Sequence, residues 1–294
     1  MSRHSPKFSF KNIRLRLKAL LIPDSLYLKH QYKKTFSKVA QLNPPETINE
    51  FILQRKLYDR NPRYTECSDK YRVRSWVEKV AGEDCLVPLL AVSDDVDEIN
   101  YASLPEPFVI KVNHGCGQNM IVREKSEVDW LSAKRQLKGW MRNSHYLNTR
   151  EWQYKNIQPM VVVEALLSEG GELPKDYKLH CFNGVVRYIA VVHDREHKAS
   201  VSFYDPQWNY LFIEWGRYEM GPKEKRPETL DEMVGLAQKL SQEFDYVRVD
   251  LYSVAGQVYF GELTFTPLNG LSKFNPEKYD RIFAQALESS GSSV

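Results

Sequence analysis

The spacing of apolar residues predicts helices in the first half of the chain and mostly strands in the second. Helical spacing runs through residues 47–57, 70–81 and 127–141, and short apolar runs predict strands at 86–92, 108–112 and 120–122. From residue 160 the predicted strands are 160–164, 176–182, 185–193, 201–204 and 210–213, before a helix over 228–244. Because helices and strands do not alternate strictly, the pattern predicts α+β layers rather than a doubly wound sheet.

Local signals mark the ends of several elements. Thr47 is placed to cap the helix that follows it, and Gly82 to end another. Asn183-Gly184 between two apolar runs is the strongest short-range signal of a β-hairpin. We divide the chain into four predicted segments: 1–42, 43–107, 108–160 and 161–294.

A second predicted hairpin, residues 248–270, carries acids within apolar strands. With a turn centred on Gly256, Asp250 faces Glu262 and Arg248 faces Thr264 on one side of the sheet. Facing like charges destabilise a strand pair, so a cation is expected between the carboxylates. Mg²⁺ binds a few carboxylates together with phosphate oxygens and water, so we favour a magnesium site over an exposed acidic hairpin. Arg248 can then stabilise charge that develops on a phosphoryl group or a tetrahedral intermediate.

Composition adds a basic N-terminal region to this picture. The chain has 294 residues, 42% of them hydrophobic, and its net charge of +3 gives no indication of nucleic-acid binding. Residues 1–38 hold ten Lys or Arg and a single acid, Asp24, with leucines and an isoleucine interleaved. This partly amphipathic pattern fits a contact with an anionic membrane or another polyanion, and it also fits a solvated helix face.

Several classes of protein are disfavoured. The four cysteines, Cys67, Cys85, Cys116 and Cys181, lack the spacing of a zinc site or a disulfide framework, which favours reduced thiols in the cytoplasm. No apolar run approaches the ~20 residues of a membrane span, and the basic start lacks the features of a secretory signal.

A glycine-containing turn joins the predicted strands at 108–112 and 120–122. Lys111 has the opposite parity to Phe108 and Ile110, so it leaves the apolar face, where its ammonium can reach phosphates. Backbone amides around Gly115 and Gly117 can hold phosphate oxygens, although the turn is not a P-loop. Taken alone, it also fits an ordinary hairpin, in which His114 and Cys116 are loop residues.

Two further segments carry candidate polar groups. The strand ending at Glu164 leads into a linker whose backbone can hold an adenine edge, although any buried strand fits this pattern. Asp176, Lys178 and His180 share one face of the next strand, which either lines a cleft or faces solvent. Arg195, beyond the Asn183-Gly184 hairpin, is a further candidate catalytic cation.

In this order, the segments resemble the TupA-like family of the ATP-grasp superfamily, named for teichuronopeptide synthesis. The resemblance rests on the stretches NPPETINEFILQRKLYDRNP, SDKYRVRSWV, LPEPFVIKVNHGCG, EWQYKNIQP, DYKLHCFNG, and RVDLY followed by GELTFTPLNGLSKFNPEKYD. It implies an ATP-grasp fold that holds a nucleotide between a small subdomain (108–160) and a large one (161–294). A further subdomain (43–107) and a basic helical segment (1–42) precede them.

The resemblance also implies roles for individual residues. The residues expected to hold ATP are Lys111 (α/β-phosphates), His114, Gly115 and Gly117 (triphosphate), Glu164 (adenine), Asp176 (ribose) and Lys178 (phosphates). The expected Mg²⁺ ligands are Asp250, Glu262 and Thr264, and the expected catalytic residues are Arg248, Lys178 and Arg195.

Two positions depart from the family pattern. Many superfamily members carry a metal-binding Asn where this chain has Thr264, and a hydroxyl is a weaker ligand, so a second Mg²⁺ is held more loosely or by water. A Glu-Lys pair that often follows the NPPETIN-type stretch is replaced by Asn49-Glu50-Phe51-Ile52, so no role is carried over there.

The resemblance implies an ADP-forming carboxylate–amine ligase, in which ATP activates a carboxylate and an amine displaces phosphate. The carboxylate is expected on a uronic acid of a cell-surface glycan, such as a capsule, or of its precursor, and the amine on an amino acid. We expect a cytoplasmic protein that can lie at the inner membrane face. A kinase or glycan transferase of the same pathway and a non-catalytic nucleotide-binding module are the alternatives.

Overall fold

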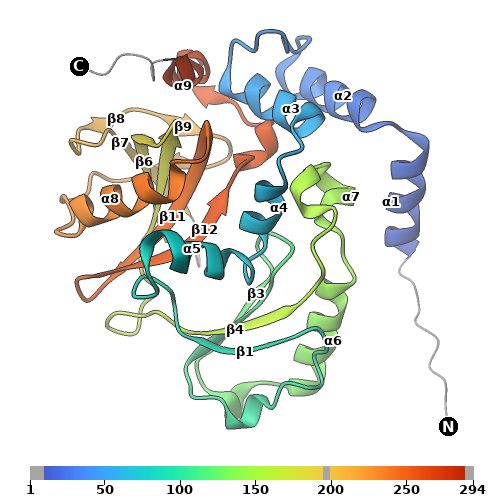
Figure 1. Cartoon of the computed structure of the whole chain (residues 1–294), viewed down its shortest axis with the longest axis vertical. Helices are drawn as coiled ribbons and strands as arrows, with labels where there is room; N and C mark the ends of the chain where they lie inside the picture. Colours follow the sequence, from blue (N-terminus) through green and yellow to red (C-terminus); the bar gives the residue numbers. More distant parts are fainter. Residues whose placement is uncertain (1–9, 195–198, 289–294) are drawn as a thin grey trace.

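The computed structural model describes residues 10–194 and 199–288. It contains a smaller antiparallel sheet and a larger sheet that is antiparallel except for its parallel edge pair (Figure 1). The predicted catalytic residue Arg195 lies outside the described residues. Within the described ranges, no helix combines the length and hydrophobicity needed to cross a bilayer.

The smaller sheet has four antiparallel strands in the order β1-β4-β2-β3. They are β1 (Leu89–Ser93), β4 (Val161–Ala165), β2 (Phe108–Val112) and β3 (Asn119–Val122). Helix α6 (Trp130–Met141) packs Leu137 against the apolar residues of this sheet. The sheet takes strands from three of the four predicted segments, so the predicted boundaries at 107 and 160 separate strands that pair with one another.

The larger sheet has seven strands, six of them in the order β10-β7-β6-β5-β11-β12, with β8 paired to β7. Their bounds are β5 (Asp176–Phe182), β6 (Val185–His193), β7 (Ser200–Tyr204), β8 (Tyr210–Leu211), β10 (Glu219–Met220), β11 (Tyr246–Val254) and β12 (Gln257–Thr264). A separate pair joins β9 (Glu214–Trp215) to β13 (Phe274–Asn275).

Helices cover the two faces of the larger sheet unequally. Helices α5 (Val73–Ala81) and α8 (Leu230–Ser241) bury one whole face, which includes Leu179, Val249 and Leu251. On the opposite face, α3 (Ile48–Tyr58) and α9 (Lys278–Glu288) cover an aromatic cluster around Phe283. By strand parity, the polar residues of β5, β11 and β12 lie on the same face as this aromatic cluster, opposite the face that α5 and α8 cover.

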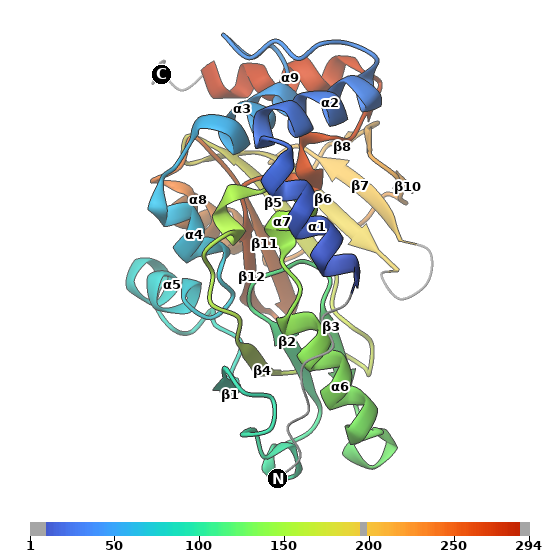
Figure 2. The same cartoon turned by 90° about the vertical axis from the view of Figure 1, so that its right-hand side faces the viewer.

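The remaining helices come mainly from the N-terminal part of the chain (Figure 2). They are α1 (Phe10–Leu21), α2 (Asp24–Phe36), α4 (Pro62–Ser68) and α7 (His145–Thr149), with 3₁₀ turns at Tyr101–Ser103, Lys125–Glu127, Trp152–Tyr154 and Pro267–Gly270. Leu28 and Tyr32 of α2 pack against α3 in a small separate core.

The predicted α+β class is confirmed, together with most element positions. Thr47 caps α3 by accepting a hydrogen bond from the amide of Glu50, and Gly82 ends α5 with φ 90°. Asn183 and Gly184 form the predicted hairpin turn, both at positive φ. The strand predicted from residue 86 begins only at Leu89, because Cys85 and Leu86 instead lie along the edge of β12.

Candidate functional site

The closing hairpin contains the predicted residue pairs, although its turn differs from the prediction. Arg248 pairs with Thr264 and Asp250 with Glu262, while the turn is the two residues Ala255 and Gly256 rather than one centred on Gly256. The predicted turn centre is therefore wrong. The pairs are nevertheless right, because β12 has one extra residue beyond the turn, which restores the expected register.

That extra residue is Gly261, which forms a β-bulge opposite the step from Asp250 to Leu251. A Cβ atom at this position would lie 3.0 Å from the backbone oxygen of Asp250 and 3.0 Å from the ring of Tyr252. Glycine thus allows β12 to approach β11 closely at the residue before Glu262, and the bulge brings Glu262 opposite Asp250.

Polar residues of three neighbouring strands share the face beside this bulge, which we call the polar face: Asp176, Lys178, His180, Arg248, Asp250, Glu262 and Thr264. Lys178 pairs directly with Asp250 and His180 with Arg248 across β5 and β11. Asp176 and Asp250 are 1% and 2% exposed, so this face is not a solvated outer surface. Of the two interpretations left open for the strand, the structure excludes exposure to solvent.

The charges of the polar face neutralise one another. The guanidinium of Arg248 donates to both carboxylate oxygens of Asp250 (2.6 and 2.7 Å), and it also donates to Thr264 Oγ1 (3.1 Å). The same guanidinium lies 3.7 Å from Glu262 Oε1. Lys178 Nζ joins Asp176 (2.6 Å) to Asp250 (2.5 Å). In this structure, the cations between the facing acids are therefore side chains of the protein.

Neighbouring charges favour the charged forms of Glu262 and Lys178, whereas burial raises the pKa of Asp250 above its ordinary value. Burial disfavours a charged Glu262, yet Lys70, Lys178 and Arg248 together keep the pKa of its carboxyl well below the ordinary value. Burial likewise disfavours a charged Lys178, and its pKa is nevertheless raised by the two aspartates beside it. In contrast, burial lowers the pKa of His180 well below its ordinary value, so this residue is a neutral partner of Tyr246 (2.9 Å).

The glycine turn after β2 is connected to the polar face through Lys70. Lys70 Nζ donates to the carbonyl of Gly115 (2.7 Å) and lies 3.3 Å from Glu262 Oε2. The base of the turn is held by Asn113, which is fully buried, donates to Asp69 (2.9 Å) and accepts from the amide of Met160 (2.7 Å). The glycine turn is thereby positioned beside the acids of the hairpin.

The residues of the glycine turn offer a ligand backbone groups rather than side chains. The imidazole of His114 is buried and contacts the carbonyl of Asn143 (3.0 Å), so only its backbone is available. Gly117 has φ 70°, a conformation that favours glycine. A Cβ atom on Gly115 would collide with the side chain of Gln118 at 2.6 Å. The predicted contribution of this turn is therefore limited to backbone groups.

A second group of charges links the smaller sheet to α5. Glu164 pairs with Lys111 (2.7 Å) through one oxygen and with Arg74 (2.9 Å) through the other. Arg74 also donates to the carbonyl of Val87 (2.8 Å). The family resemblance implies separate roles for Lys111 (phosphates) and Glu164 (adenine), whereas in the structure the two side chains are in direct contact.

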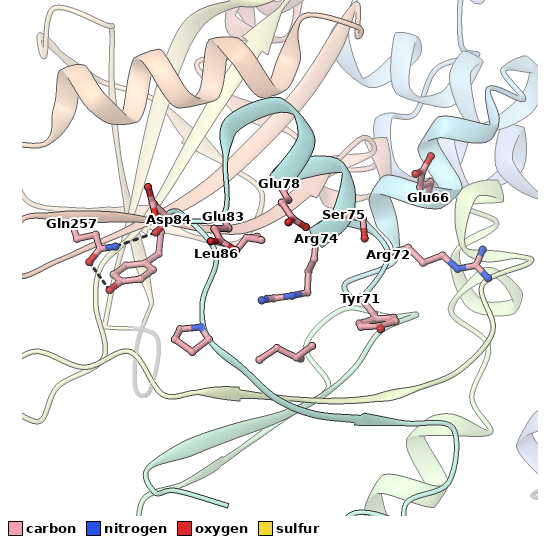
Figure 3. A pocket seen from close by; sticks show the side chains of 13 residues that line it. Glu66, Tyr71, Arg72, Arg74, Ser75, Glu78, Glu83, Asp84, Leu86 and Gln257 are labelled. Atoms are coloured by element: carbon pink, nitrogen blue, oxygen red, sulfur yellow. Dashed lines mark hydrogen bonds between the residues drawn. The ribbon is translucent and has the colours of Figure 1, made fainter.

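A cavity of about 940 Å³ adjoins this group, and Arg74 points into it (Figure 3). Tyr71, Ser75 and Glu78 line it from α5 and the turn before that helix, and Tyr259 lines it from β12. Its position beside Glu164 makes it a candidate place for part of a ligand that also contacts the polar face. Lys70 and Arg74 were not identified from the sequence, although both lie within the SDKYRVRSWV stretch on which the family resemblance rests.

A third group, also missed in the sequence, surrounds Glu151. The buried Glu151 carboxylate contacts His145 Nε2 (2.6 Å) and accepts a hydrogen bond from Thr266, whose hydroxyl also accepts from Gln153 (2.8 Å). Burial opposes the charge of Glu151, but His145 and Lys56 lower its pKa. The sequence signal that could have identified this group is the EWQYKNIQP stretch, which begins at Glu151 and includes Gln153.

Lys56 extends this group. It is 1% exposed and donates to Asn269, and burial lowers its pKa to about 8 against the opposing effects of Glu151 and Asp24. Asn269 follows β12 in a turn where Leu268, Asn269 and Gly270 all have positive φ. The Glu151 group therefore supports the chain directly after the acidic hairpin.

Two facing α+β layers, with a glycine turn set against a buried face of cations and acids, are the arrangement expected of an ATP-grasp protein. A family comparison agrees with this class. The model of the TupA-like ATP-grasp family matches residues 50–288, and the chain belongs to this family.

Solved structures show a distant similarity. D-alanine–D-alanine ligase from Bacillus anthracis is 17% identical, with a TM-score of 0.47 over 76% of this chain and 67% of that one. The same enzyme complexed with ATP is 18% identical (TM-score 0.43, 68% and 55% covered). The ATP-grasp ligase PsnB complexed with a minimal precursor is 13% identical (TM-score 0.40, 70% and 53% covered). The chain thus spans little more than half the length of the latter two, and no match was found among the curated proteins.

Proposed function

We propose that the chain is an ATP-dependent, ADP-forming ligase that activates a carboxylate as an acyl-phosphate and joins it to an amine. The observation that carries this proposal is the polar face, where Arg248 and Lys178 lie between the buried Asp176 and Asp250 and the half-buried Glu262, beside the glycine turn. Fixed cations in a buried site suit a reaction in which negative charge moves between phosphate and acyl oxygens.

Lys70, Lys111 and Lys178 are the cations suited to bind a triphosphate in this proposal, since all three lie close to the glycine turn or the acids. Each is already paired with a protein carboxylate, so phosphate would compete for existing ion pairs. Asp176 is the acid proposed to bind the ribose. Its carboxylate is buried and paired with Lys178, so a ribose hydroxyl would have to approach this ion pair. The adenine is proposed to lie near Glu164 and the adjoining cavity.

Asp250 and Glu262, with the Thr264 hydroxyl, are the donors proposed for Mg²⁺. No three His, Cys, Asp or Glu side chains among the described residues form a metal-binding group on their own. Two carboxylates are nevertheless sufficient for Mg²⁺, which takes its other ligands from phosphate and water. When bound, the ion would neutralise charge on the phosphates, and Arg248 would remain beside the reacting group.

The proposed substrates are a uronic acid of a cell-surface glycan or glycan precursor and the amine of an amino acid. Membership of a family named for teichuronopeptide synthesis supports this choice. The acceptor is proposed to enter beside the Glu151 group, because Thr266 and Asn269 follow the acidic hairpin directly.

The test is ADP release from Mg²⁺·ATP in the presence of pairs of uronic acids and amino acids, with the product identified by mass spectrometry. The expected product is an amide formed with one ADP per bond. Arg248→Met should abolish turnover, whereas Arg281→Met, which removes an exposed ion pair with Glu46, should not. A stable phosphate ester would instead identify a kinase, a glycosidic product a transferase, and ATP binding without turnover a non-catalytic module.

A further inference from the structure

The first two helices expose apolar side chains to solvent. Leu17, Leu20 and Leu21 of α1 are 52%, 81% and 77% exposed, and Leu26 at the start of α2 is 63% exposed. They surround the corner between the two helices, which lies at the outer edge of the molecule (Figures 1 and 2). We call these four leucines the corner patch.

The two helices are fixed to the body of the protein through the one acid of residues 1–38. Asp24 accepts from the hydroxyl of Tyr146 (2.6 Å) and from Arg150 (3.1 Å). The Arg150 side chain is 1% exposed, and its guanidinium lies over the ring of Tyr27. The corner patch therefore belongs to a docked element with a defined orientation.

This anchor also determines the charge of the surface around the patch. Because Asp24 is directed inward to α7, it does not neutralise the outward lysines of α2. Lys29, Lys33 and Lys34 are exposed, and none of them takes part in the ion pairs found between described residues. The surface thus combines exposed leucines with unneutralised positive charge.

We propose that the corner patch and the α2 lysines bind the surface of an anionic lipid bilayer. Apolar side chains that enter the interface together with lysines that remain at the headgroups are the features of a helix that lies on a membrane. Charge favours this occupant over a second copy of the chain, which would bring two basic surfaces together. A membrane contact here would place the bilayer near the Glu151 group, because Arg150, which anchors α2, is followed directly by Glu151.

The experiment is co-sedimentation of the full chain with vesicles of phosphatidylglycerol and phosphatidylcholine, compared with vesicles of phosphatidylcholine alone. Binding is expected only to the anionic vesicles, and it should weaken as salt is added. The double variant Leu20→Asp/Leu21→Asp should bind at least ~10-fold more weakly. The matched control is Leu131→Asp, because Leu131 is a 71% exposed leucine of α6 that should tolerate the change.

A second pair of variants tests the charges. Lys29→Glu/Lys33→Glu should lose binding to anionic vesicles, whereas Lys225→Glu/Lys239→Glu, which changes the net charge equally on another surface, should retain it. Circular dichroism of each variant verifies that the fold is retained.

Three results would overturn the proposal: no binding of the unaltered chain to anionic vesicles, equal losses in the patch and control variants, or a lipid-free dimer that Leu20→Asp/Leu21→Asp dissociates. In the last case a second copy, not a bilayer, covers the patch. Vesicle binding needs no nucleotide, so the proposal is tested separately from the ligase activity.

Discussion

Replacing Arg248 by methionine tests whether the polar face is held together by its own ion pairs. The side chain of Arg248 is 12% exposed and that of Asp250 is 3% exposed. The variant therefore leaves the buried Asp250 carboxylate without the guanidinium that binds both of its oxygens. Removal of one partner from a buried ion pair costs about 3–5 kcal/mol. Lys178 remains 2.5 Å from Asp250, so we expect a cost near the lower end, about 3 kcal/mol.

The assay is urea unfolding monitored by tryptophan fluorescence, together with a thermal scan. A loss of about 3 kcal/mol corresponds to a decrease of roughly 6–12 °C in Tm for a chain of this size. Arg281→Met, which removes the exposed pair with Glu46, should change stability by less than about 1 kcal/mol.

A double variant tests whether the effects of Arg248 and Asp250 on stability depend on each other. Arg248→Met/Asp250→Leu replaces both buried charges by apolar groups. It should be more stable than Arg248→Met alone, because Asp250 no longer lacks its guanidinium partner and Lys178 keeps its pair with Asp176. The reasoning is refuted if Arg248→Met unfolds at the urea concentration of the unaltered chain, or if the two substitutions are additive.

Three further predictions concern the bulge, the buried lysine and the glycine turn. Gly261→Ala should destabilise the chain by about 1–3 kcal/mol in urea unfolding, because its Cβ meets the facing backbone, whereas Gly235→Ala in α8, where nothing lies within 4 Å, should not destabilise it. The pKa of Lys56 is about 8 in the folded chain, below its ordinary value, so the unfolded chain binds more protons above this pH and stability should rise between pH 8 and roughly pH 10. Lys56→Met should remove that rise, and an unchanged pH profile would contradict the assignment. Lys70→Ala should raise the Kd for Mg²⁺·ATP about tenfold in calorimetry, through loss of a charge-assisted contact, while the exposed Lys79→Ala should leave it unchanged.

The local sequence determined the features that depend on neighbouring residues. The cap at Thr47, the end of α5 at Gly82 and the Asn183-Gly184 turn each follow from a conformational preference of one or two residues. The alternation of side chains along a strand was likewise sufficient to place Arg248 and Asp250 on one face. Family membership was also recognisable, because its motifs are contiguous stretches.

Only the tertiary structure decided which residues these side chains contact. The cations around the acids include Lys178 from another strand and Lys70 from the turn before α5, and no local pattern measures those distances. The pairing of Asp250 opposite Glu262 depends on a bulge at Gly261, where glycine is needed because the backbone of the facing strand lies so close. Burial, charge pairing and the inward direction of Asp24 are properties of packed surfaces, so they emerge only when segments distant in the sequence come together.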